Sequence, residues 1–312
     1  MLASVILAPL ALGQMSEYAP VPPAAVGLLV PEKGYILEEI RDGVYWVSNG
    51  GHQSLIVTTG EGVILVDAPL NIGENLLKAV AEVSGKPIKY FINSHHHRDH
   101  TGKAGILPSG VTYVSQELVA RKLAEVNDPG RPVPALTFSE RYTLRMGGKR
   151  IELSYKGVNH SPGNTFIYLP DQKILMFIDV ITPGWVPPLR LSAAEDIAGY
   201  IRAFDQVLEY DFDHFVGGHV ARIGTRSDVE EGREYIHDVI ANARVALKAV
   251  SPRDIAKQVD MQNRLLFLKN YFSAVASNCA AATEAKWTGR LGAADVWTVD
   301  NCSAMQLHLR ID

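Results

Sequence analysis

Residues 95–100 read His-His-His-Arg-Asp-His, which places four histidines and one aspartate within six positions. Imidazole nitrogens and carboxylate oxygens are good zinc ligands, with bonds of about 2.0–2.2 Å. In extended backbone, alternate side chains point the same way, so we expect His95 and His97 to share one metal. Asp99 and His100 can then reach a second metal nearby. A solvated loop and an affinity tag are the other interpretations. A tag does not fit the position of the run, in mid-chain directly after an apolar strand.

Three further residues are candidate metal ligands. They are His160, Asp179 and His219. Taken singly, each has an ordinary structural explanation: a cap, a turn and a buried core histidine. Each also follows the C-terminal end of a predicted strand, in the connecting segments where site residues tend to collect. Together they therefore favour a metal site.

Two β-rich blocks must position these residues. The first has predicted strands at 35–40, 44–48, 53–59, 62–67 and 88–92, and a helix at 72–83 inferred from the spacing of apolar residues. The second has strands at 111–114, 142–144, 150–155, 164–169, 173–178 and 212–216, and helices at 116–126 and 193–210. Further helices are expected at 229–250, with a capping box of Ser227 and Glu230, and at 264–281. This order predicts two packed sheets with helices outside them and a helical tail.

The pattern His-x-His-x-Asp-His, followed by His, Asp and His, resembles that of the metallo-β-lactamase superfamily. The resemblance covers roughly residues 35–225. It implies an α+β fold, a four-layer αββα sandwich with metals at one edge, and leaves 226–312 as a helical C-terminal extension.

The resemblance also implies roles for individual residues. Asp67, at the end of its strand, would support the metal loop through hydrogen bonds. The first metal would be bound by His95, His97 and His160. The second would be bound by Asp99, His100 and His219. Asp179 would bridge the two metals.

Two zinc ions are the expected cofactors, with manganese or mixed metals left open. Flavodiiron members of the superfamily carry glutamate where this chain has His97, together with a flavodoxin domain, and this chain has neither. The implied activity is that of a hydrolase (EC 3). A hydroxide bridging the metals would attack the carbonyl carbon of an ester, lactone, amide or thioester. Asp99 would orient the nucleophile and pass a proton to the leaving group.

The substrate is less constrained than the chemistry. The largest subclass of true β-lactamases has cysteine where this chain has Asp179, and lysine where it has Thr182, so weak or promiscuous β-lactamase activity is an alternative. Phosphodiester hydrolysis and a non-catalytic metal-binding module are further alternatives, and a complete set of seven ligands argues against the module. Trp185 and Arg190 are candidate substrate-binding residues because they closely follow Asp179; core packing for Trp185 and a surface charge for Arg190 are the alternatives.

Composition limits the partners. The chain has 312 residues, of which 47% are hydrophobic and 21% charged, and its formal net charge is −4. No long block of lysine and arginine is present, which argues against a nucleic-acid partner. No membrane partner is expected, since no apolar run is long enough to span a bilayer. A small-molecule substrate is expected, and the oligomeric state stays open.

The N-terminus has the pattern of an export signal. Residues 2–12 are largely apolar, and residues 11–13 offer a small-x-small cleavage pattern. We therefore expect a signal peptide at 1–13, an extended lead-in at 14–34, and a secreted or periplasmic protein; a cytoplasmic protein is the alternative. Cys279 and Cys302 would then form one disulfide, or stay two buried thiols if the protein is not exported.

Overall fold

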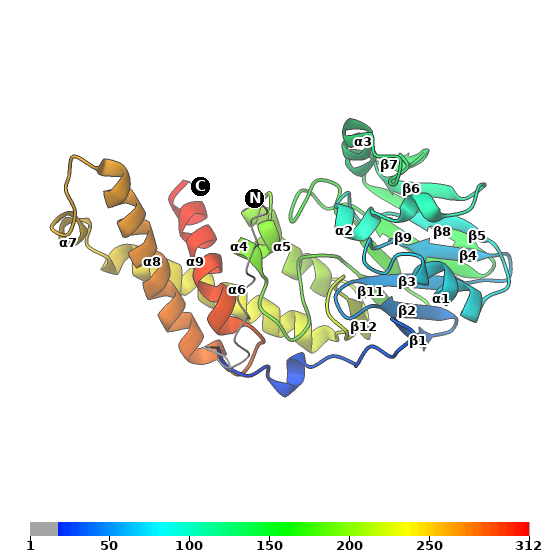
Figure 1. Ribbon diagram of the computed structural model, residues 1–312, viewed down its shortest axis with the longest axis horizontal. Helices are drawn as coiled ribbons and strands as arrows, with labels where there is room; N and C mark the ends of the chain where they lie inside the picture. The colour runs from blue at the N-terminus through cyan, green and yellow to red at the C-terminus, as the bar shows by residue number, and fades with distance from the viewer. Residues whose placement is uncertain (1–17, 312) are drawn as a thin grey trace, which may run out of the picture.

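Two β-sheets lie face to face, and helices cover their outer faces (Figure 1). The computed structural model describes residues 18–311. The first sheet has seven strands in sequence order: β1 (Ile36–Arg41), β2 (Val44–Ser48), β3 (Gln53–Thr58), β4 (Val63–Val66), β5 (Ile88–Ile92), β6 (Thr112–Gln116) and β7 (Leu136–Phe138). The second has five, in the order β12 (His214–Val216), β11 (Ile174–Met176), β10 (Phe166–Leu169), β9 (Lys149–Ser154) and β8 (Arg141–Met146).

Strand direction explains where the loops collect. β1 to β4 are antiparallel hairpin partners, whereas β4 to β7 run parallel to one another. In the second sheet β11 and β12 are also parallel. The carboxyl ends of β4 and β5 therefore meet at one edge of the first sheet, and those of β11 and β12 meet at one edge of the second.

Apolar side chains fill the space between the sheets. Trp46, Ile64 and Ile92 of the first sheet pack with Ile167 and Met176 of the second, and all five are at most 1% exposed. Such burial removes apolar surface from water and is the main stabilising term of the sandwich.

The helices and short 3-10 turns complete the outer layers. They are η1 (Pro23–Ala25), α1 (Asn75–Val83), α2 (Arg98–Thr101), η2 (Ala104–Ile106), α3 (Glu117–Val126), α4 (Leu189–Ala193), α5 (Ile197–Leu208), α6 (Arg226–Ala249), α7 (Pro252–Ala256), α8 (Arg264–Trp287) and α9 (Ala294–Ile311). α1 packs on the outer face of the first sheet, and α5 on the outer face of the second. The predicted four-layer α+β sandwich with C-terminal helices is confirmed.

The C-terminal helices pack as one group. α6, α8 and α9 contact one another, and Figure 1 shows them beyond α5, on the side away from the first sheet. A disulfide between Cys279 of α8 and Cys302 of α9 joins two of them. Within residues 18–311, no helix is both long and apolar enough to cross a membrane.

Several predicted elements differ in detail. The predicted helix at 193–210 begins only at Ile197, after the Asp196 carboxylate accepts a hydrogen bond from the Gly199 amide. The capping box of α6 is formed by Thr225 and Asp228, two residues earlier than predicted. β7 was not predicted, and α9 lies in the predicted helical extension at 226–312 without having been assigned as a separate helix. The predicted signal peptide at 1–13 lies outside the described residues, and the domain boundaries at 34 and 225 stay predictions.

The segment called α4 has an unusual backbone. Its five residues, Leu189–Ala193, all have positive φ, between 49° and 61°. L-residues avoid this left-handed conformation, at a cost of about 1–2 kcal/mol each. Tertiary contacts must therefore hold the segment in place.

Candidate metal centre

The loop after β5 carries the histidine run and is held by a buried carboxylate. Asp67 follows β4, and its Oδ1 accepts a hydrogen bond of 2.8 Å from the Ser94 amide. Its Oδ2 lies 3.8 Å from Nδ1 of His100. Asp67 is fully buried, and burial raises its pKa to about 6 against the opposing effect of His100 and Ser94. The structure thus places Asp67 where the resemblance implied a supporting role.

The run itself is not extended throughout. Backbone at His97 is extended, but α2 begins at Arg98, so a single helical turn orients Asp99 and His100. His95 and His97 lie on one side, as alternation predicted, with ring centroids 4.6 Å apart.

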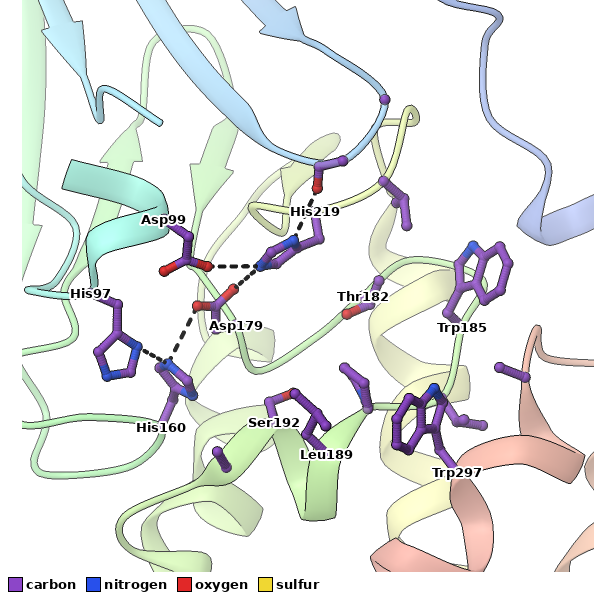
Figure 2. Close-up of a pocket in the computed structure, with 17 residues that line it drawn as sticks. His97, Asp99, His160, Asp179, Thr182, Trp185, Leu189, Ser192, His219 and Trp297 are labelled. Atoms are coloured by element: carbon purple, nitrogen blue, oxygen red, sulfur yellow. Dashed lines mark hydrogen bonds and ion pairs between the residues drawn. The ribbon is translucent and has the colours of Figure 1, made fainter. Parts of the chain in front are cut away.

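Four residues form a first cluster of potential metal ligands. Each of the four contributes one potential ligand atom, and these atoms all lie within 4.8 Å of one another; the residues are His95, His97, His160 and Asp179. The Nε2 atom of His160 is 2.9 Å from Nδ1 of His97 and 3.3 Å from Oδ2 of Asp179 (Figure 2). Nε2 of His95 is 3.4 Å from the same oxygen. Ligands around a tetrahedral zinc lie about 3.3–3.6 Å apart when the bonds are 2.0–2.2 Å, so most of these spacings suit such an ion.

A second cluster lies next to the first. It contains Asp99, His100 and His219, as the resemblance implied, and also His52. Nε2 of His100 is 3.2 Å from Nε2 of His219 and 3.4 Å from Oδ2 of Asp99. Asp179 connects the clusters, since its carboxylate oxygens lie 3.4 Å from His100 and 2.9 Å from His219.

His52 was not among the predicted site residues. Its side chain is only 14% exposed, and its Nε2 lies 3.5 Å from Oδ2 of Asp99. The Asn49 side chain accepts a hydrogen bond from the His52 amide and so turns the loop between β2 and β3 over the cluster. The Gly51 carbonyl in that loop also lies 2.9 Å from Nδ1 of His219. That contact favours a proton on Nδ1 and leaves Nε2 of His219 free to bind a metal.

Loop geometry brings the remaining ligands to this edge. Asp179 follows β11 with φ of 65°, and the Asn164 amide holds that turn through a 2.9 Å hydrogen bond to the Ile178 carbonyl. Gly218 precedes His219 with φ of 94°. A Cβ atom at Gly218 would lie 2.7 Å from the Ile178 side chain and 3.2 Å from His100, so a larger residue would disturb both clusters.

The electrostatics favour bound positive charge. Burial lowers the pKa of His160 to about 4 and holds that of His95 well below its usual value, so both rings are neutral at neutral pH and offer lone pairs. Burial also disfavours charge on His100, yet the carboxylates of Asp179, Asp67 and Asp99 outweigh it and raise the pKa of His100 to about 9. A metal ion would satisfy the same carboxylates and displace that proton.

The donor set fits metal ions. Nε2 of His95 is buried, points toward Asp179 and has no hydrogen-bond partner among the described residues. Buried polar atoms without partners are rare in proteins, and a missing ion is a common explanation. Nitrogen and carboxylate ligands suit zinc, and also manganese or iron.

A cavity of about 440 Å³ opens beside the clusters. His97, Asp99, His160, Asp179 and His219 line one end of it. Figure 2 shows the side chains of Trp185 and Trp297 at the other end.

The two predicted substrate-binding residues have different positions. Trp185 lines the cavity, as does Thr182, the residue that stands where many β-lactamases have lysine. Arg190 is exposed and is not among the residues that line the cavity. Trp297 had no sequence signal, because it lies on a helix that was not assigned separately.

Comparisons with known proteins agree with this geometry. A family model described as the metallo-beta-lactamase superfamily matches residues 47–219. The chain is 28% identical over 223 residues to the 2,4-dinitroanisole O-demethylase subunit alpha of Nocardioides sp. (strain JS1661), covering 70% of this chain and 67% of the relative. It is 27% identical over 175 residues to the metallo-beta-lactamase type 2 of Bacteroides fragilis, covering 55% of this chain and 67% of the relative. Among solved structures, a metallo-beta-lactamase from Pontibacter korlensis is similar with a TM-score of 0.57 and 25% identity, covering 64% of this chain and 97% of that one.

Proposed function

The chain belongs to the metallo-β-lactamase superfamily, and from this premise we propose that it is a metal-dependent hydrolase of a small molecule. The bond cleaved is a carbonyl ester, lactone, amide or thioester bond. The observation that carries the proposal is the pair of adjacent His/Asp clusters joined by Asp179 at one end of a cavity. A single structural metal would not require two clusters that share a carboxylate.

We assign two zinc ions to the site. His95, His97 and His160 would hold the first, Asp99, His100 and His219 the second, and Asp179 would contact both. Metals bound there would lower the pKa of water to about 7 and polarise a carbonyl group. Manganese or a mixed pair satisfies the same ligands.

Asp99 is suited to orienting the nucleophile. Both Asp99 and Asp179 line the cavity, but the Asp99 side chain is 45% exposed whereas that of Asp179 is buried. Burial disfavours charge on Asp99, but the neighbouring His52 and His100 hold its pKa well below the usual range. It is therefore an anion that can accept a hydrogen bond from the attacking water and so orient it.

Ether cleavage is a second candidate. The Nocardioides relative is named as a subunit of a 2,4-dinitroanisole O-demethylase. Attack of water on such an aryl methyl ether, with transfer of one proton to the departing oxygen, would give a phenol and methanol without an oxidant. The apolar lining of the cavity is compatible with this substrate.

β-Lactam hydrolysis is disfavoured. Among the described residues that line the cavity there is no lysine or arginine to bind a β-lactam carboxylate, and Thr182 occupies the relevant position. Phosphodiester hydrolysis is disfavoured for the same reason, because a phosphodiester is also an anion.

We also propose that the protein works in an oxidising compartment, as a secreted or periplasmic enzyme. The disulfide between Cys279 and Cys302 supports this, since disulfides are rare in reducing cytosol.

The test combines metal analysis with a substrate panel. Purified protein is assayed for zinc and manganese content, then for cleavage of a lactone, a thioester, phenyl acetate, a β-lactam, bis(p-nitrophenyl) phosphate and 2,4-dinitroanisole. We expect about two metal ions per chain and cleavage of at least one carbonyl compound or the ether. Asp99→Ala should abolish turnover, whereas Asp205→Ala, on the exposed side of α5, should not. A protein that binds two metals and cleaves none of the six would refute the proposal.

A further inference from the structure

We propose that the far end of the cavity is a slot for a neutral aromatic ring, formed by Trp185, Leu189 and Trp297. This inference rests on the proposed function and specifies its substrate: an aromatic carbonyl compound or aryl ether without a charged group on the ring. It depends on the surfaces of the slot and on the absence of cationic groups from its lining.

The end of the cavity away from the metal clusters is apolar. The apolar residues of the cavity lining are Trp185, Val186, Pro188, Leu189, Ala193, Val220, Ala293 and Trp297. Figure 2 shows the two indoles there, with Leu189 and Ser192 between them and the His/Asp clusters. Indole faces bind flat aromatic groups well, because stacked or edge-to-face contacts add to the gain from buried area.

Trp185 is held in a fixed position. Its indole N–H donates a 2.9 Å hydrogen bond to the Ala25 carbonyl of η1. Its ring lies against Gly292, where an added Cβ atom would come within 2.5–2.6 Å of ring atoms. The backbone of Trp185 also pairs with Gly292, and the Val186 amide donates to the Gly292 carbonyl. A ring held in this way loses little conformational freedom when a ligand binds.

The lining of the slot disfavours an anion. Among the described residues that line the cavity, the potential cations are the histidines of the metal clusters. Arg190, the nearest arginine in sequence, is exposed and outside the lining. A carboxylate placed between the indoles would lose its hydration without gaining a partner, which costs several kcal/mol. A neutral ring avoids this cost.

Leu189 forms the exposed wall of the slot. It is 59% exposed and belongs to the left-handed segment of positive φ. That segment is held by a buried side chain of α9, since Asn301 accepts a hydrogen bond from the Leu191 amide and donates one to the Pro187 carbonyl. Both the Trp297 ring and the position of Leu189 therefore depend on α9.

Binding of three small probes tests the slot without turnover. Isothermal titration calorimetry of the full-length, metal-loaded protein is carried out with 1,3-dinitrobenzene, 3-nitrobenzoate and nitrocyclohexane, none of which has a hydrolysable carbonyl or ether bond. We expect 1,3-dinitrobenzene to bind at least tenfold more tightly than either other probe. Trp297→Ala should weaken its binding about tenfold, or about 1.4 kcal/mol. Trp297→Leu, which keeps an apolar side chain but removes the ring, should also weaken it, by severalfold.

Two controls separate the slot from general effects. Val299→Ala lies on the same helix at an exposed position outside the cavity and should leave binding unchanged. Leu189→Asp introduces an anion at an exposed position and should weaken binding of 1,3-dinitrobenzene more than the neutral Leu189→Asn. Aspartate and asparagine tolerate left-handed backbone, so both variants should fold even if Trp297→Ala does not.

The outcomes distinguish this inference from the proposed function. Equal binding of nitrocyclohexane and 1,3-dinitrobenzene would overturn the slot, as would wild-type binding of 1,3-dinitrobenzene by a folded Trp297→Ala or by Leu189→Asp. If 1,3-dinitrobenzene binds as expected but no compound of the substrate panel is cleaved, the slot stands and the hydrolase proposal fails. If esters are cleaved without preference for aryl groups and no probe binds, the hydrolase proposal stands and the slot fails.

Discussion

Replacement of Asn301 by leucine should destabilise the protein and disturb the cavity at the same time. Asn301 belongs to α9 and is fully buried against the segment 187–191. Its side chain accepts a 2.8 Å hydrogen bond from the Leu191 amide and donates 2.9 Å bonds to the Pro187 carbonyl and the Tyr235 hydroxyl. Leucine has a similar volume but can form none of these three bonds.

The expected loss follows from the groups left without partners. The Leu191 amide and the Pro187 carbonyl would each lose a buried partner, at a cost of about 1–3 kcal/mol per group. The Tyr235 hydroxyl would keep its contact with Thr298. Relaxation of the left-handed segment would recover part of the cost, since each residue there stores about 1–2 kcal/mol. We therefore expect the free energy of unfolding to fall by about 2–4 kcal/mol.

Urea unfolding measures this loss. Circular dichroism and tryptophan fluorescence are followed together, because coincident transitions are needed for a two-state value. Asn278→Leu is the matched control: Asn278 lies exposed on α8, donates only to the Ala274 carbonyl, and should change stability by less than about 0.5 kcal/mol. Asn301→Leu should also weaken binding of 1,3-dinitrobenzene while leaving metal content unchanged. A loss below 0.5 kcal/mol for Asn301→Leu would refute the account of the left-handed segment.

Four further predictions concern the metals, the disulfide and the backbone. Removal of metal by a chelator should lower the thermal midpoint, since a ligand at a thousandfold excess over its Kd stabilises by about 4 kcal/mol; an unchanged midpoint in demonstrably metal-free protein would contradict this. His52→Ala should weaken binding of the second metal at least tenfold by competition with a chelator dye, because His52 contacts the ligand Asp99, whereas His214→Ala, on β12, should not; equal affinities would show that His52 does not support this metal. Replacing Cys279 and Cys302 by alanine should cost about 3 kcal/mol, the chain-entropy value for residues 23 apart in sequence, and wild-type stability in the double variant would disprove it. Gly218→Ala should reduce metal content, because its Cβ would clash with the Ile178 side chain, and full occupancy would argue against this packing.

Much of the metal centre was predictable because its ligands follow strands. Once β5, β11 and β12 are inferred from apolar runs, parallel pairing brings the residues after them to common sheet edges. Asp179 and His219 therefore share an edge of the second sheet, whereas their contact with His95, which follows a strand of the first sheet, was implied by the family resemblance. The residue spacing did not show that a helical turn would begin at Arg98, because a four-residue helix has no detectable periodicity.

Other parts depend on contacts that are distant in sequence. His52 reaches the second cluster only because the Asn49-Gly50-Gly51 turn folds over it, and that turn was the one available signal. The residue types of α4 do not predict its five positive φ values, since none of the five residues is glycine, asparagine or aspartate. α9 was not assigned as a separate helix because buried residues occur around much of its surface, which removes the one-sided pattern that indicates a helix.

The position of Trp297 has a consequence for how such an enzyme could diversify. The segment matched by the family model ends at residue 219, whereas Trp297 and Asn301 come from α9. Substitutions in α9 could therefore retune which molecules are accepted while the inherited ligands stay constant. Relatives with different C-terminal helices would then be expected to share the metal ligands but to differ in the substrates that they accept. Exchange of α6–α9 between two such relatives would transfer the substrate preference and leave the type of reaction unchanged.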